Sequence, residues 1–179
     1  MTLGNRDIID CMGRNISGFN AEQVGPSSYD CRLGVGMKAI FDRQEPITIP
    51  SFREVQYTDL ELNDDGYYEI KPFQFALATT EEFIKMPDNI DAHVDGRSSI
   101  GRLGLMVHVT AGYIDPGFFG QITLELFNAT SSSIFIEPGA KICQLVFSMV
   151  SNCTEPYNKR KSSKYNWKEG PTGSRLEMD

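Results

Sequence analysis

The chain has 179 residues and a formal net charge of −7 at pH 7, and 40% of its residues are hydrophobic. This length suits one domain with its own core, and the acidic balance argues against a nucleic-acid polymer as partner, because no overall basic field attracts one. No apolar run approaches the roughly 20 residues that cross a bilayer, so we expect no membrane partner.

Short strands separated by turn residues dominate the predicted elements. The chain opens with a short amphipathic helix, NRDIIDCMG, that should turn Ile8, Ile9 and Met12 inward and end at Gly13. One helical turn fits SSIGRLGL, since its glycines oppose a longer helix. The predicted strands lie within residues 28–41, 67–80, 93–98, 105–111, 120–128 and 133–147. Strands about every ten residues, with Pro, Gly, Asn and Asp between them, predict an all-β sandwich or barrel.

The strand at 120–128 carries a carboxylate between two leucines. Alternation puts Leu124 and Leu126 on one face, and Thr123 and Glu125 on the other. Taken alone, this pattern favours a glutamate on a solvated outer face.

From about Ser151 onward the pattern changes to polar residues with isolated aromatics. We therefore divide the chain into a core at 1–150 and a tail at 151–179, both parts of one domain. The tail is either disordered or a flap that orders on a ligand. Its basic run NKRKSSK, like the pair Arg97 and Arg102, can attract a small polyanion despite the net negative charge.

The cysteines and histidines argue against a zinc site. Four cysteines stand singly along the chain, and only two histidines exist, His93 and His108, which we expect to be structural. This also excludes the zinc-deaminase pattern, in which a His/Cys/Cys-bound metal activates water. The N-terminus lacks a basic region followed by an apolar stretch. Together with the free thiols, this predicts the cytoplasm.

Several ordered blocks resemble the dCTP deaminase family, within the trimeric dUTPase-like superfamily. The central block is PFQFALATTEEFIKMPDNIDAHVDGRSSIGRLGLMVHVTAGYIDPGFFGQITLELFN. GPSSYDCRLG lies upstream of it, and PGAKICQLVF and EPYNKRKSSKYNWKEG follow. The resemblance spans about residues 24–170, and several blocks in order are far more specific than one Gly-rich loop.

The resemblance implies a mostly β fold, a distorted β-barrel or double-stranded β-helix of the dUTPase-like type, with short helices and a polar C-terminal flap. It also implies a homotrimer whose active sites lie between subunits and close under the tail. Deamination in this family uses no zinc. A glutamate activates the water that attacks C4 of cytosine and passes its proton to the leaving ammonia, and Glu125 holds that position here. A partly desolvated carboxylate can accept a proton and return it near neutral pH.

The RSSxxR motif supplies further candidates by resemblance. Ser98 and Arg102 match a serine and an arginine that act at the phosphates and at the attacked ring or its water, so they join Glu125 as catalytic candidates. Arg97 and Ser99 lie in the same turn, whose amides and charges suit phosphate. The sequence alone equally allows a helix-starting serine beside an exposed arginine.

Asp115 is the fourth catalytic candidate, since it matches the acid of IDPG. That acid holds the deoxyribose 3′-hydroxyl and, in dUTPases, also orients the hydrolytic water. A turn-forming aspartate before Pro-Gly is the simpler interpretation. Asp115 and Glu125 are ten residues apart, across the turn PGFFG and into the next strand, and a hairpin of that length can bring both acids to one cavity.

The remaining nucleotide-binding candidates flank this core. Gln144 matches a glutamine that contacts phosphate, although a buried glutamine bonded to backbone is its alternative. Thr123 shares the strand face of Glu125 and is therefore a further nucleotide-binding candidate. In the tail, Tyr157, Lys164 and Lys168 match positions that reach the base or the triphosphate, or else belong to a solvated charge run.

Departures from the family pattern separate its branches. AGYID puts Tyr113 where single-activity deaminases carry an arginine. This motif and CQLVF are closer to members that deaminate dCTP and also cleave dUTP to dUMP and pyrophosphate. Glu125 argues against a plain dUTPase, which carries an apolar residue there. We therefore expect both activities. The alternatives are a single-activity dCTP deaminase, a dUTPase alone and, in a different class, a nucleotide-binding trimer without chemistry.

The expected cofactor is Mg²⁺ held through the triphosphate, with no metal site built from protein side chains. Three phosphates crowd their negative charge closely together, and Mg²⁺ in proteins commonly binds through such substrate phosphates. The expected small-molecule partners are dCTP and dUTP. Inhibition by dTTP depends on the loop from His108 to Gly112 and stays open at this point.

Overall fold

The structure is a computed structural model that describes residues 1–40, 49 and 55–176. Its first helix, α1 (Asn5–Met12), buries Ile8 and Met12 and is capped by Gly13, as predicted. Ile9 was expected inward but is 44% exposed. Ile8 and Met12 are four residues apart and share a face, whereas Ile9 lies about 100° around the helix from Ile8.

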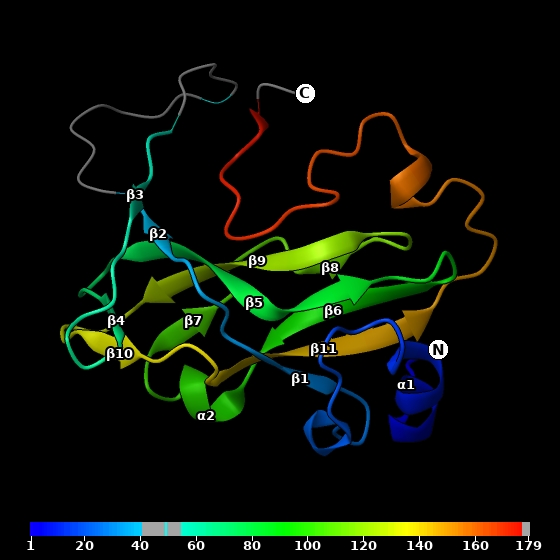
Figure 1. Cartoon of the computed structure of the whole chain (residues 1–179), viewed down its shortest axis with the longest axis horizontal. Coiled ribbons are helices and arrows are strands. Elements are labelled where there is room, and N and C mark those ends of the chain that lie inside the picture. Colours follow the sequence, from blue (N-terminus) through cyan, green and yellow to red (C-terminus); the bar gives the residue numbers. More distant parts are fainter. Residues whose placement is uncertain (41–48, 50–54, 177–179) are drawn as a thin grey trace.

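The described strands form three antiparallel sheets (Figure 1). The largest sheet has the order β3 (Thr58–Asp59), β2 (Lys38–Ala39), β5 (Phe75–Lys85), β9 (Phe119–Asn128) and β7 (Leu105–Val107). The second has the order β1 (Tyr29–Arg32), β11 (Lys141–Met149), β6 (Ile90–Gly96) and β8 (Tyr113–Ile114). The third pairs β10 (Ile134–Ile136) with β4 (Tyr68–Ile70). Short helical segments complete the list: η1 (Ala21–Gln23), α2 (Ser98–Gly101) and η2 (Tyr157–Lys159).

The predicted mostly β fold is confirmed, although each sheet of the described chain is open and ends in edge strands, so no closed barrel forms. Each predicted strand region contains observed strands, and SSIGRLGL forms the single turn of α2. Phe41, at the end of the first predicted region, lies outside the described residues.

The region 28–41 divides into β1 and β2, which belong to different sheets. Gly34 lies at the crossing, where its N–H donates to Thr79 O at 2.8 Å. A Cβ at Gly34 would stand 2.6 Å from Thr80 O. The chain can therefore change sheets here only because the side chain is a hydrogen atom.

Apolar faces of the two larger sheets form the core. Along β9 buried and half-buried residues alternate, with Ile122, Leu124 and Leu126 inside, as the sequence pattern predicts. Glu82 is buried with them, and its carboxylate accepts hydrogen bonds from Arg32 N and Nε at 3.0 and 3.1 Å. These bonds tie β1 to β5, across the two sheets, and compensate for burying the charge.

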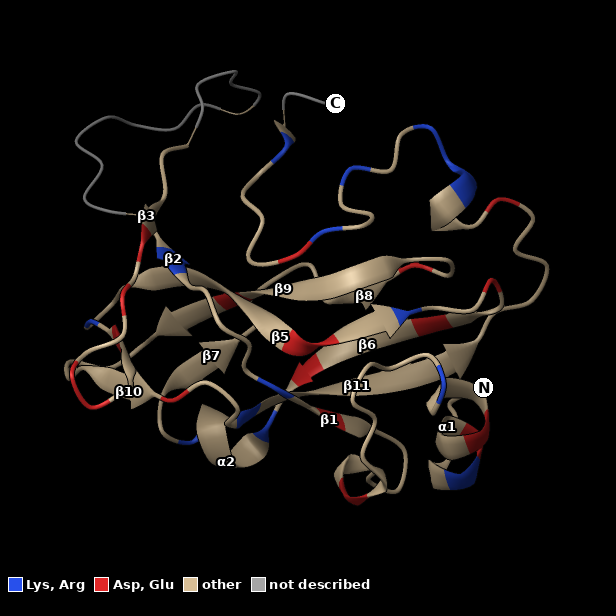
Figure 2. Cartoon of the chain, viewed as in Figure 1, with Lys and Arg blue, Asp and Glu red and all other residues tan. Residues whose placement is uncertain are grey.

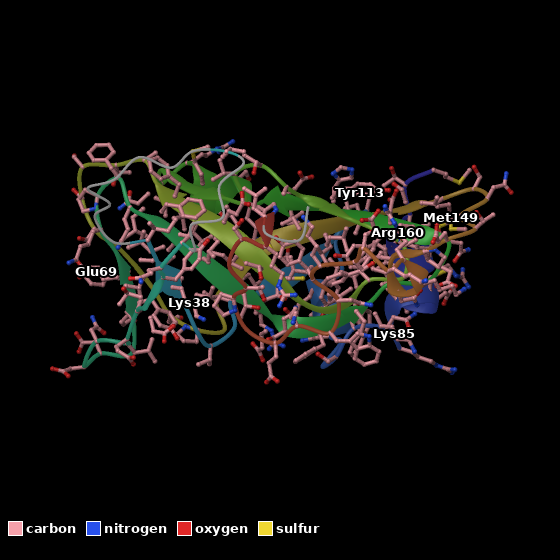
Figure 3. The ribbon with its side chains drawn as sticks, turned by 90° about the horizontal axis from the view of Figure 1, so that it is seen from above. Lys38, Glu69, Lys85, Tyr113, Met149 and Arg160 are labelled. Atoms are coloured by element: carbon pink, nitrogen blue, oxygen red, sulfur yellow. The ribbon has the colours of Figure 1, made fainter. Side chains whose placement is uncertain are left out.

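Two regions lie on opposite sides of these sheets. Figure 1 shows the C-terminal segment above β8 and β9, whereas α2 lies at the lower edge beside β1 and β11. Seen from above, Glu69 and Lys38 lie toward one end of the molecule, and Tyr113, Arg160 and Met149 toward the other (Figure 3). No helix in the described ranges is long and apolar enough to cross a membrane.

Candidate active site

A cavity of about 560 Å³ opens where β8, β9 and the C-terminal segment meet. Its walls combine aromatic side chains, such as Phe118 and Tyr165, with titratable groups. The predicted site residues among its lining are Asp115, Thr123, Glu125, Tyr157, Lys164 and Lys168. An apolar cavity with a few convergent polar groups is the usual form of a small-molecule site.

Glu125 presents its carboxylate from the half-buried face of β9. Its Oε2 accepts hydrogen bonds from Thr110 N at 3.1 Å and Thr110 Oγ1 at 3.0 Å. Within the described ranges, Oε1 accepts no hydrogen bond, so one oxygen is fixed and the other remains available to a ligand. A carboxylate held in this way can exchange a proton with a bound molecule without changing its rotamer.

The loop beside Glu125 has an uncommon backbone conformation. His108 has a φ of 63°, in the left-handed region that costs a non-glycine residue about 1 kcal/mol. Its N–H donates to Glu125 O at 2.8 Å, and its Nδ1 accepts from Glu125 N at 3.4 Å. His108 Nε2 is buried and has no hydrogen-bond partner among the described atoms. His108, which the sequence leads us to expect as a structural histidine, also lines the cavity.

Asp115 lines the same cavity, but the predicted hairpin was wrong. β8 pairs with β6 and β9 with β5, so the two segments belong to different sheets. Phe118 N donates to Asp115 O at 3.2 Å, and Gly117 has a φ of 79°. PGFFG therefore turns the chain from one sheet to the other instead of folding one ribbon back on itself.

The C-terminal segment enters the site at η2. Tyr157 N donates to Pro116 O at 2.8 Å, and the Tyr157 ring lies 6.1 Å from that of Phe118. These contacts bring Tyr157 to the cavity wall directly beyond the turn that carries Asp115.

Further along, the segment lies parallel to β9 on the same chain. Trp167 N donates to Phe119 O at 2.7 Å, and Gln121 N donates to Lys168 O at 3.1 Å. A Cβ at Gly120 would stand 3.0 Å from Lys168 O, so this close approach depends on glycine. The pairing holds the backbone of Lys168 beside the cavity.

Two side chains of β9 extend the same attachment. Gln121 Oε1 accepts from Gly170 N at 2.8 Å, and Thr123 Oγ1 accepts from Thr172 N at 3.1 Å. Thr123 therefore holds the tail, in addition to lining the cavity. The tail acts as a strap that β9 binds through both backbone and side chains.

The remaining predicted residues do not line this cavity. Ser98, Ser99 and Arg102 are exposed on and after α2, while Arg97 and Gln144 lie beside β1 and β11. Figure 2 shows the corresponding basic positions in two places, along the C-terminal segment and around α2. Within one chain, the predicted site residues therefore lie in two separate groups, one at the cavity and one around α2, β1 and β11.

Comparison with known proteins decides the family. A model of dCTP deaminase-like proteins matches residues 2–150. The chain is 45% identical over 166 residues to "dCTP deaminase, dUMP-forming" of Dictyoglomus thermophilum, covering 88% of this chain and 83% of that protein. The protein of the same name from Coprothermobacter proteolyticus is 38% identical over 176 residues, with 97% and 94% covered. The chain belongs to the dCTP deaminase-like family.

A solved structure shares the fold. The 2′-deoxycytidine 5′-triphosphate deaminase of Agrobacterium tumefaciens aligns with a TM-score of 0.62 and 20% identity, over 83% of this chain and 47% of that chain. At this identity the likeness shows the shared fold alone. The resemblance inferred from the sequence is confirmed by the family match.

Tyr113, in the AGYID motif, is held by two side chains of β6. Its hydroxyl donates to Asp91 Oδ2 at 2.9 Å, and its ring packs edge-on against His93 at 5.1 Å. Although the residue is half exposed, partial burial and then the bond to Asp91 raise the pKa of Tyr113 to about 12. The phenol therefore stays neutral at physiological pH with its proton donated to Asp91, and it lines the cavity beside Asp115.

Several residues of the site were missed from the sequence. Gln121 follows the same alternation that singled out Thr123 and Glu125, so the strand pattern could have found it. Thr110 and Tyr57 reach the site from loop positions, where no periodicity exists to indicate a direction. Asp30 stands in the quoted GPSSYDCRLG block but carried no assigned role.

Proposed function

We propose that this protein deaminates dCTP to dUTP and ammonia and then hydrolyses dUTP to dUMP and pyrophosphate. The observation that carries the proposal is Glu125, whose Oε2 is fixed by Thr110 while Oε1 remains available at the wall of the cavity. Relatives named "dCTP deaminase, dUMP-forming" support the choice of substrate and of both activities.

In the deamination step, Glu125 takes a proton from a water molecule that attacks C4 of the cytosine. The resulting tetrahedral carbon carries both the new hydroxyl and the amino group. Glu125 then returns the proton to the amino nitrogen, the C4–N bond breaks, and ammonia leaves uracil behind. The fixed Oε2 keeps the carboxylate in one orientation through both transfers.

In the second step, Asp115 orients a water molecule for attack on the α-phosphorus of dUTP. The bond to the β-phosphate oxygen breaks, so dUMP and pyrophosphate form. Asp115 and Glu125 line one cavity from different sheets, which gives the two reactions separate carboxylates in a single pocket. Tyr113 beside Asp115 places a neutral phenol, whose proton is donated to Asp91, where single-activity members carry an arginine.

The active assembly is a homotrimer in this proposal. The nucleotide base lies with Glu125, whereas Ser98, Ser99, Arg102, Arg97 and Gln144 lie apart from the cavity of their own chain. A neighbouring copy can bring its RSSxxR turn to the phosphates, while the tail closes from the chain that supplies Glu125. Each site then needs residues of two chains.

Magnesium is proposed to enter with the substrate. Across residues 1–40, 49 and 55–176, no three His, Cys, Asp or Glu side chains are grouped as a metal site. Mg²⁺ usually keeps several waters and binds through substrate phosphates, so these take the place of protein ligands here. When bound, the ion neutralises charge on the triphosphate. The cysteines of the described chain are all free, which suits action in a reducing cytoplasm.

The test is incubation of the purified protein with dCTP and Mg²⁺, with ammonia measured by a coupled assay and nucleotides separated by chromatography. The proposal expects ammonia with dUMP as the nucleotide product. Ammonia with accumulating dUTP would mean a single-activity deaminase, and cleavage of added dUTP without ammonia would mean a dUTPase. A protein that binds dCTP without either product would be a nucleotide-binding trimer.

Light scattering at the mass of a monomer would contradict the site shared between chains. Repeating the assay with dTTP decides whether it inhibits.

A further inference from the structure

The residues beside α2 form a cluster centred on one carboxylate. Asp30 in β1 is paired in register with Gln144 in β11, and its Oδ1 accepts from Gln144 Nε2 at 3.0 Å. Its Oδ2 lies 3.4 Å from Arg97 Nη2 and 3.3 Å from Lys141 Nζ. Three donors from β11 and the end of β6 therefore converge on a single acid.

The acid lies deeper than the cations that surround it. The side chain of Asp30 is 14% exposed, compared with 29% for Arg97 and 39% for Lys141. Arg97 has five N–H donors and Lys141 three. Arg97 Nη1 donates to Lys141 O at 3.3 Å, and each cation retains donors on its solvent side. The cluster therefore presents positive charge outward over a partly buried negative centre.

Without the acid this arrangement would be unstable. Arg97 and Lys141 approach the same oxygen atom, so the two positive charges repel each other once Asp30 is neutral. The amide of Gln144 is also oriented by Asp30, together with Ser28 Oγ at 3.3 Å. Asp30 balances one of the two positive charges and leaves a net positive group of fixed geometry.

We propose that Asp30 is a positioning residue for the triphosphate, holding Arg97, Lys141 and Gln144 in one arrangement, and that Lys141 adds a cation to the phosphate contacts. The inference rests on the proposed function in taking a nucleoside triphosphate as the ligand. Asp30 itself repels phosphate and touches neither the cavity nor Glu125, so its effect passes through the groups that it holds.

The first measurement is the steady-state kinetics of Asp30→Asn with dCTP. Asparagine keeps the size and an acceptor for Gln144 but loses the charge that holds Arg97 and Lys141. KM should rise about tenfold, the order expected for losing one charge-assisted hydrogen bond, with kcat within twofold of wild type. Asp59→Asn is the matched control, because it also removes a carboxylate near a lysine, Lys38 at 3.9 Å, on an exposed strand.

The second measurement is calorimetric binding of inorganic tripolyphosphate, which needs no turnover. Asp30→Asn should weaken tripolyphosphate binding about tenfold and leave binding of deoxycytidine unchanged. Lys141→Gln, on a more exposed side chain, should weaken tripolyphosphate binding about threefold and serves if Asp30→Asn does not fold. Loss of turnover in the wild type would defeat the proposed function but leave this comparison valid. Unchanged or tighter tripolyphosphate binding by Asp30→Asn, or by Lys141→Gln in its place, would overturn the positioning role.

Discussion

Replacing Glu125 with glutamine tests the proposed chemistry most directly. The glutamine side chain has the same shape, and its amide oxygen can accept the two bonds that Thr110 N and Oγ1 donate to Oε2. What disappears is the ability to take a proton from water and return it to the amino group. General acid–base catalysis contributes typically about 10²–10⁴-fold to a rate, so kcat for ammonia release should fall by about that factor. This corresponds to about 3–5 kcal/mol of activation free energy.

The same substitution has a small, calculable effect on stability. Hydrogen bonds to a charged acceptor contribute about 1.5–3 kcal/mol and neutral ones about 0.5–1.5 kcal/mol. The two Thr110 bonds are exposed to solvent, so we expect a total loss of only about 1–2 kcal/mol. For a chain of this size that lowers Tm by about 2–8 °C. Because glutamine keeps the shape of the side chain, binding of dCTP should stay within about threefold of wild type. A threefold change corresponds to only about 0.7 kcal/mol of binding free energy.

The assay is single-turnover release of ammonia from dCTP, with thermal unfolding and dCTP binding measured on the same preparations. Glu137→Gln is the control, since it makes the same chemical change at an exposed position outside the cavity. A Glu125→Gln protein that retained more than a few per cent of wild-type ammonia release would remove Glu125 from the role of base. A protein that lost dCTP binding together with activity would mean that the carboxylate mainly holds the pocket.

Three further predictions concern the second acid, the tail and the buried tyrosine. Asp115→Asn should lose dUTP cleavage more completely than deamination, so that chromatography shows dUTP accumulating from dCTP. Glu125→Gln, in contrast, should still cleave added dUTP. Equal loss of both activities in both variants would contradict separate roles for the two acids. Ending the chain at Ser151 should leave a folded core, because β11 ends at Met149. The same truncation should lower kcat at least about 100-fold, because Tyr157, Lys164 and Lys168 no longer complete the cavity. If circular dichroism shows an unfolded core, the tail is a structural element instead. Burial raises the pKa of Tyr29 to about 12, so the folded protein keeps this phenol neutral while the unfolded chain ionises near pH 10. The stability that this difference provides is present below pH 10 and is lost as the pH rises to 12, by an amount on the order of 2 kcal/mol. In urea unfolding, the free energy of unfolding of Tyr29→Phe, which has no phenol at this position, should fall less between pH 10 and 12 than that of the wild type. Equal falls in the two proteins would mean that the raised pKa does not belong to Tyr29.

The sequence predicted the strands well because their signal is local. The alternation along β9 and the burial of Leu124 and Leu126 follow directly from the period of two, whatever the strand pairs with. The same local signal failed at PGFFG, where a turn between two strands looks the same whether they pair with each other or enter different sheets. Sheet membership depends on contacts across the whole chain, such as Gly34 against Thr80, that no short pattern contains.

The candidate site was harder to predict than the fold. The motifs predict Glu125, Asp115 and the tail residues as site residues together with Ser98 and Arg102, although the chain holds them in two separate groups. A motif indicates which residues take part in a family's chemistry, not where the fold places them. The contacts of Asp30 show the converse limit, since the positioning role proposed for this acid depends on its contacts with Gln144, Arg97 and Lys141, which no short motif contains.

The strap along β9 also affects how the protein behaves between turnovers. Phe119 O and Gln121 N are backbone groups on an edge of β9, and the tail is what bonds them. If the tail lifts to admit substrate or release product, those groups become an open sheet edge of the kind that pairs with other chains. Occupancy of the site and resistance to aggregation should therefore rise together, and a preparation stored with a bound nucleotide should keep its monodispersity longer than one stored without it.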